Sequence, residues 1–127
     1  MKPSVLVVED DPATMRLITY ALNNAGYQVM VGYGGEDAIR KVKAHKPDLV
    51  LTDLEMPQVT GYDVIAAVRQ DPATRDIPVI AVTAHLWDGG GLSASRVGCT
   101  GYISKPFTAT YLVQEIRKYL PANRRGD

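Results

Sequence analysis

Short apolar runs alternate with amphipathic segments along this chain of 127 residues. The run at residues 49–51 is continuous in Leu and Val, which is typical of a strand buried on both faces of a sheet. Four other runs also predict strands, and the least apolar of them, residues 27–31, is expected at a sheet edge. The five predicted strands span residues 5–8, 27–31, 49–51, 78–82 and 102–104.

The segments between these runs repeat apolar residues at helical spacing. They predict helices over residues 12–25, 36–46, 62–70 and 109–120. Asp11 and Thr108 can cap the first and the last of these helices, and Pro12 suits a first helical position. Gly26 is expected to end the first helix, and Pro47 blocks continuation of the second.

Strands that alternate with helices predict an α/β fold, a five-stranded parallel sheet with helices on both faces. We expect right-handed crossovers and the flavodoxin-like strand order 2-1-3-4-5, whose switch point lies between strands 1 and 3. Ligands bind such sheets at the carboxyl ends of the strands. Glu9, Asp10 and Asp53 follow strands 1 and 3 and should share one crevice. Thr83 and Lys105 follow strands 4 and 5.

The composition of the chain argues against several classes of function. The chain has 14 basic and 14 acidic residues, so no basic surplus points to nucleic acid or to an anionic membrane. No apolar run approaches the ~20 residues of a membrane span, and residues 5–8 are too short for the apolar part of a signal peptide. The single cysteine, Cys99, excludes an internal disulfide, fits a reducing cytoplasm and is interpreted as a small buried apolar residue.

Three carboxylates in one crevice repel one another unless a cation compensates them. Oxygen ligands with room for water suit Mg²⁺, which pairs protein carboxylates with phosphate. Lys105 can supply a second positive charge and Thr83 a hydroxyl donor. This set fits phosphoryl transfer onto a carboxylate, with Asp53 as nucleophile and with Mg²⁺ and Lys105 neutralising the phosphoryl oxygens.

Four short motifs then give the chain a family resemblance. They are Val7-Val8-Glu9-Asp10, Thr52-Asp53-Leu54-Glu55-Met56-Pro57, Val82-Thr83-Ala84 and Tyr102-Ile103-Ser104-Lys105-Pro106-Phe107. Each motif alone is weak, but four in this order and at this spacing are specific. Over residues 5–120 the chain resembles the response-regulator receiver domain of two-component signalling, and it is most similar to single-domain receivers.

The resemblance implies a role for each matching acid. Asp53 would be the phosphoacceptor and, with Asp10, a direct ligand of Mg²⁺. Glu9 would act on the metal mainly through water, and Glu55 would offer it a backbone carbonyl.

The resemblance also implies roles for residues of the last two motifs. Lys105 and Thr83 would contact phosphoryl oxygens, and Tyr102 would turn inward when Thr83 moves. The peptide bond between Lys105 and Pro106 is expected to be cis.

The function implied is a phosphorylation-switched signalling module. A sensor histidine kinase or a histidine phosphotransfer protein would supply the phosphoryl group, and a downstream protein would bind the switched face. We expect a cytoplasmic monomer or weak dimer that takes part in its own phosphorylation and slow autodephosphorylation but is not otherwise an enzyme. Residues 1–120 would form the receiver domain and residues 121–127 a polar tail.

Each site residue also has an ordinary interpretation. These are a strand-end cap for Asp53, a solvated charge for Glu9, a β-branched strand residue for Thr83, a surface charge for Lys105 and half-buried packing for Tyr102. Asp11 is interpreted as the helix cap rather than as a ligand. Two other functions stay open: a constitutive binding adaptor that is not phosphorylated, and a phosphatase with an Asp nucleophile, which Asp53-Leu54-Glu55 resembles only loosely.

The resemblance implies a further helix between the fourth and fifth strands, where residues 89–91 are three consecutive glycines. Each glycine costs a helix about 1 kcal/mol relative to alanine, so we expect residues 88–91 to be irregular and the helix at 92–97 to be short or frayed. His85 could border the phosphoryl site or be a surface residue, and Trp87 is interpreted as packing or as a partner contact.

Overall fold

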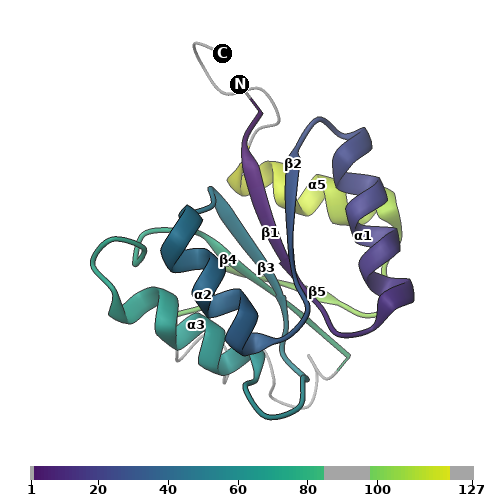
Figure 1. Ribbon diagram of the computed structural model, residues 1–127. Helices are drawn as coiled ribbons and strands as arrows, with labels where there is room; N and C mark the ends of the chain where they lie inside the picture. Colours follow the sequence, from purple (N-terminus) through teal and green to yellow (C-terminus); the bar gives the residue numbers. More distant parts are fainter. Residues whose placement is uncertain (1, 85–97, 121–127) are drawn as a thin grey trace.

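A computed structural model describes residues 2–84 and 98–120 of the chain. In it, five parallel strands form one sheet in the predicted order, β2-β1-β3-β4-β5 (Figure 1). The strands are β1 (Ser4–Val8), β2 (Gln28–Gly32), β3 (Leu49–Asp53), β4 (Val79–Thr83) and β5 (Gly101–Ser104). The helices are α1 (Pro12–Asn24), α2 (Gly35–His45), α3 (Gly61–Gln70) and α5 (Ala109–Tyr119). No described helix has the length and apolar character needed to cross a membrane.

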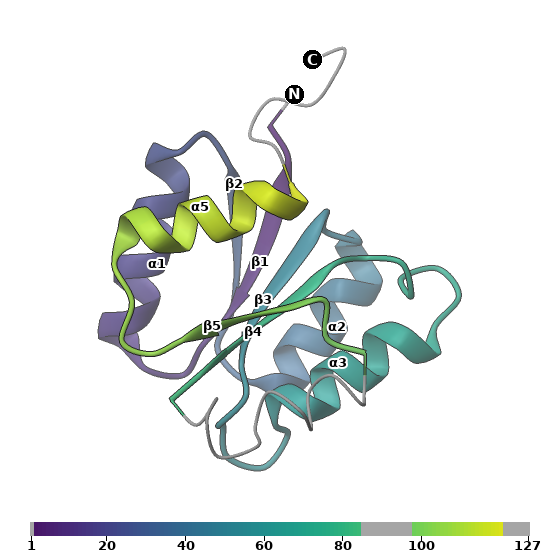
Figure 2. The ribbon, with the colours of Figure 1, turned by 180° about the vertical axis from the view of Figure 1, so that it is seen from behind.

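The helices lie in two layers. Helices α1 and α5 cover one face of the sheet, and α2 and α3 cover the other (Figures 1 and 2). The side chains of β1 alternate between these layers: Val5 and Val7 pack into the core under α1 and α5, whereas Leu6 and Val8 pack under α2 and α3. A strand buried on both faces must be apolar at every position, which explains the continuous apolar runs in the sequence.

The helix ends follow the predicted capping chemistry. The Asp11 carboxylate accepts a hydrogen bond from the backbone N–H of Thr14, and the Thr108 hydroxyl accepts one from Tyr111. Gly26 adopts a φ of 95° directly after α1, a conformation that glycine reaches without steric cost. These local signals set where the helices begin and end.

At the candidate site, the third and fourth strands run further than the sequence pattern indicates. The third strand continues through Thr52 to Asp53, and the fourth continues to Thr83. The cause is pairing between strands, because Asp53 lies in register with Val82 and Thr83 lies in register with Ser104. Two candidate site residues therefore belong to the rigid ends of strands and not to the loops after them.

The predictions for residues 88–97, for His85 and Trp87, and for the tail at 121–127 lie outside the described residues.

Gly61 allows the loop after β3 to return closely onto the strand. Its backbone N–H donates to the carbonyl of Leu54 at 3.3 Å. A Cβ atom at position 61 would lie 2.1 Å from the carbonyl oxygen of Asp53 and 2.7 Å from Cα of Leu54. These contacts are with backbone atoms, so any side chain here must displace the end of β3.

We expect Gly61→Ala to lower the free energy of unfolding by about 1–3 kcal/mol, because overpacking against backbone forces the strand to move. Gly34→Ala is the matched control, since a Cβ there meets nothing within 4 Å. Its expected cost is about 0.5 kcal/mol, from the weaker N-cap preference of alanine. Urea denaturation of the two variants measures both values, and equal costs would contradict the close approach at Gly61.

Candidate functional site

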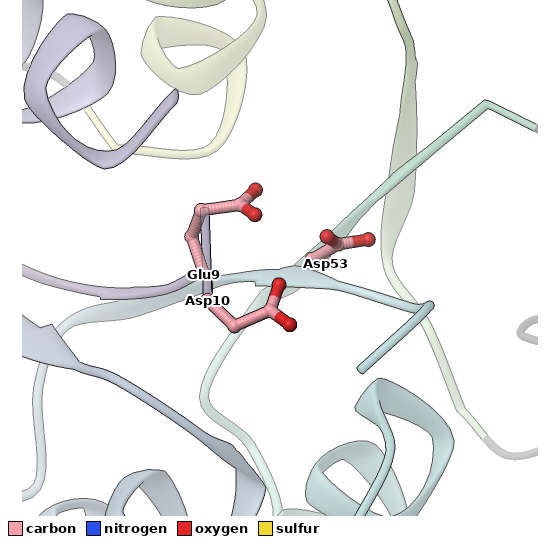
Figure 3. Close-up of side chains that lie close together, drawn as sticks. All are labelled: Glu9, Asp10 and Asp53. Carbon is pink, nitrogen blue, oxygen red and sulfur yellow. The ribbon is translucent and has the colours of Figure 1, made fainter. Parts of the chain in front are cut away.

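Three carboxylates gather at the carboxyl ends of β1 and β3. Each of Glu9, Asp10 and Asp53 places one oxygen so that all three oxygens lie within 4.8 Å of one another (Figure 3). The register of the sheet causes this, because Val8 pairs with Thr52 and the next residues along the two strands are Glu9 and Asp53. Glu9 and Asp53 are only 2% and 3% exposed, whereas Asp10 faces solvent.

Lys105 reaches this cluster from the end of β5. Its Nζ donates to a carboxylate oxygen of Asp53 at 3.0 Å and to one of Glu9 at 3.3 Å. Its backbone N–H donates to the carbonyl of Thr83 at 2.9 Å, which fixes the chain where β4 and β5 end. The Lys105–Pro106 peptide bond is cis, as predicted. Lys105 is thus a partly buried counter-ion for two acids and not a free surface charge.

Backbone donors hold the two buried carboxylates in place. Asp53 accepts a hydrogen bond from the N–H of Glu55 at 3.0 Å, and Glu9 accepts one from the N–H of Asp11 at 3.0 Å. Both bonds replace water that these carboxylates lose on burial. With Lys105 on one oxygen and Glu55 N–H on the other, the Asp53 carboxylate has a fixed orientation.

The electrostatics of the cluster show an excess of negative charge. Burial raises the pKa of Glu9 to about 7; the Asp11 N–H and Lys105 oppose this change, and the charge of Asp53 adds to it. Burial alone would lower the pKa of Lys105, but its hydrogen bond to Asp53 and the charges of Asp53 and Glu9 raise it. When ionised, three carboxylates and one ammonium sum to a formal charge of −2.

The net negative charge of the cluster and its set of oxygen donors both fit a small divalent cation. The available ligand atoms are carboxylate oxygens, which Mg²⁺ prefers, and the exposed side at Asp10 leaves room for the water molecules that Mg²⁺ retains. A charge of +2 would also balance the acids that Lys105 leaves uncompensated. The structure therefore brings together the three side chains expected to share a metal site.

Asp11, the third consecutive acid, has a different role. Its carboxylate accepts from both the N–H and the hydroxyl of Thr14, at 3.0 and 2.6 Å. It caps α1 as predicted and is not among the residues of the acidic cluster.

Thr83 has a partner that the sequence did not reveal. Its side chain is fully buried, and its hydroxyl donates to a carboxylate oxygen of Glu55 at 2.8 Å. The sequence interpretation gave Glu55 only a backbone role, and no local signal could have indicated this contact, because the two residues are 28 positions apart. Tyr102 lies half-buried against the core under α2 and α3.

Comparisons with known proteins agree with this geometry. The family model described as response regulator receiver domain matches residues 5–117, and the chain belongs to that family. The polar-differentiation response regulator DivK of Brucella anthropi is 36% identical over 120 residues, which cover 94% of this chain and 98% of the relative.

Solved structures show the same fold. Chemotaxis protein CheY4 of Vibrio cholerae superposes with a TM-score of 0.90 at 27% identity, covering 94% of this chain and all of that one. The receiver domain of sensor histidine kinase PA1611 from Pseudomonas aeruginosa superposes with a TM-score of 0.87 at 28% identity, covering 94% of this chain and 98% of that one. That second structure has a magnesium ion coordinated in its active site cleft.

Proposed function

We propose that this chain is a response-regulator receiver that accepts a phosphoryl group on Asp53. The observation that carries the proposal is the environment of that carboxylate. Asp53 is oriented by a backbone N–H and a lysine ammonium beside two further acids, at the edge of the sheet where ligands bind. A strand-end cap would need neither the partly buried lysine nor the acidic neighbours.

The chemistry is nucleophilic attack by an Asp53 carboxylate oxygen on phosphorus. A phosphohistidine of a sensor kinase or of a phosphotransfer protein is the donor: the new O–P bond forms, the P–N bond breaks, and the imidazole leaves with the electron pair. Lys105 is close enough to Asp53 to neutralise charge on the phosphoryl oxygens. Later attack by water on the acyl phosphate releases inorganic phosphate and returns the carboxylate, so the module resets slowly without being an enzyme that turns over external substrates.

The proposed reaction also requires Mg²⁺. Asp10 and Asp53 would be direct ligands, Glu9 would act through water, and Glu55 would contribute its backbone carbonyl. When bound, Mg²⁺ would stabilise charge on the phosphoryl oxygens.

The output is a change in partner binding. Phosphorylated Asp53 would draw the Thr83 hydroxyl toward a phosphoryl oxygen, and Tyr102 would then turn inward. A phosphoryl group shifts such an equilibrium only by its differential interaction with the two states. A downstream protein, in the cytoplasm, would recognise the changed face; nucleic acid and membrane are not among the proposed partners.

The phosphoacceptor is tested by intact mass spectrometry after incubation with acetyl phosphate and Mg²⁺. We expect wild type to gain the mass of one phosphoryl group and Asp53→Asn to gain none, because the amide is not a nucleophile. Asp76→Asn, which alters an exposed acid before β4, is the control and should be phosphorylated like wild type. If wild type stays unmodified, the chain is a constitutive adaptor; if Asp53→Asn is modified, another residue is the acceptor.

The metal site is tested by calorimetric titration with Mg²⁺. Asp10→Asn should weaken binding about tenfold or more, since a charged ligand is lost. Asp11→Asn is the matched control: it removes the adjacent charge, keeps a good N-cap residue and should change affinity by less than about threefold. Equal losses in the two variants would show that only general charge matters and would remove Asp10 from the ligand set.

A further inference from the structure

The strongest feature outside the phosphoacceptor set is the contact between Glu55 and Thr83. Glu55 lies two residues after β3, and its carboxylate reaches the end of the neighbouring strand, where it accepts the Thr83 hydroxyl proton at 2.8 Å. Burial raises the pKa of the Tyr62 phenol at the start of α3, and the negative charge of Glu55 raises it further. The Glu55 carboxylate therefore lies at the end of β4.

We infer that the Glu55 side chain is a positioning residue that holds the Thr83 hydroxyl in the unphosphorylated arrangement. This inference rests on the proposed function and deepens it. A hydroxyl carries a single O–H donor, so Thr83 cannot donate to Glu55 and to a phosphoryl oxygen at once. To accept a hydrogen bond from Thr83, the phosphoryl group must therefore replace the Glu55 carboxylate as the acceptor. Glu55 thus opposes the movement of Thr83 toward phosphorylated Asp53.

The geometry favours this role over a surface contact. Thr83 is fully buried, and a hydrogen bond from a buried hydroxyl to a carboxylate costs more to break than the same contact in solvent. The Glu55 backbone N–H meanwhile donates to Asp53 at 3.0 Å, so one residue contacts the acceptor through its backbone and the switch residue through its side chain. Displacement of the Glu55 side chain is thereby linked to the state of Asp53.

The experiment is a double-mutant cycle with beryllofluoride, a stable mimic of the phosphoryl group, at saturating Mg²⁺. The dissociation constant is measured by calorimetry for wild type, Glu55→Ala, Thr83→Ala and the double variant. A charge-assisted hydrogen bond that must break before binding predicts that Glu55→Ala binds about 3- to 10-fold more tightly than wild type. In the Thr83→Ala background, Glu55→Ala should lack this gain, because there is no hydroxyl to release.

Two conservative variants separate hydrogen bonding from charge. Glu55→Gln removes the charge but keeps an oxygen acceptor, so its affinity should fall between those of wild type and Glu55→Ala. Thr83→Ser keeps the hydroxyl and should restore the effect of Glu55→Ala. Because Glu55 is exposed, its variants should fold even if Thr83→Ala does not.

Two results would show an effect of charge alone and overturn the inference. In the first, Glu55→Ala increases the affinity for beryllofluoride equally in wild type and in Thr83→Ala. In the second, Glu55→Ala and Glu55→Gln increase this affinity equally. Unchanged or weaker binding by Glu55→Ala would overturn it as well. In those cases beryllofluoride still binds wild type but not Asp53→Asn, and the proposed function stands. If wild type does not bind beryllofluoride, the proposed function and this inference fail together.

Discussion

Two buried carboxylates of like charge, side by side, are the constraint on which the rest of the site depends. The pairing of β1 with β3 puts Glu9 next to Asp53 in a region almost without solvent, where repulsion is screened far less than in water. One lysine, brought from β5, contacts both acids. The three carboxylates still outnumber the single ammonium, so binding of a divalent cation would be electrostatically favourable. The environment of Asp53 would then depend on the charge of the ion or group that binds beside it.

The fold supplies the rigidity that this arrangement requires. Like charges stay close only when their backbones cannot relax apart, and here both backbones end central strands covered on each face by helices (Figure 1). The close return of the chain at Gly61 packs directly against the end of β3. Stability of the core and reactivity of the site are therefore achieved by the same strands.

Sequence reasoning predicted most of this fold, because strands buried on two faces and helices with cap residues leave strong local patterns. It also located Glu9, Asp10, Asp53 and Lys105, since parallel topology brings the ends of apolar runs to one edge. The predicted ends of the third and fourth strands were too early, because polar residues such as Asp53 stay in the sheet through pairing that no local pattern records.

The contact between Glu55 and Thr83 shows a different limit of the sequence. Glu55 has the sequence environment of an ordinary loop acid, and Thr83 that of an ordinary strand residue. Their hydrogen bond depends on the packing of β3 beside β4 and on one side-chain conformation, which neither composition nor periodicity specifies. Pairwise side-chain chemistry of this kind became visible only in three dimensions.

The three acids of the cluster are buried to different extents, and this difference affects how fast a bound cation could exchange with solvent. Glu9 and Asp53 are enclosed, but Asp10 stands in solvent, so the cluster is open on one side. A cation bound there would exchange with the surrounding solution without any unfolding of the protein. Occupancy of such a site would follow the free concentration of the cation, so the charge balance around Asp53 would depend on the ionic composition of the surrounding solution.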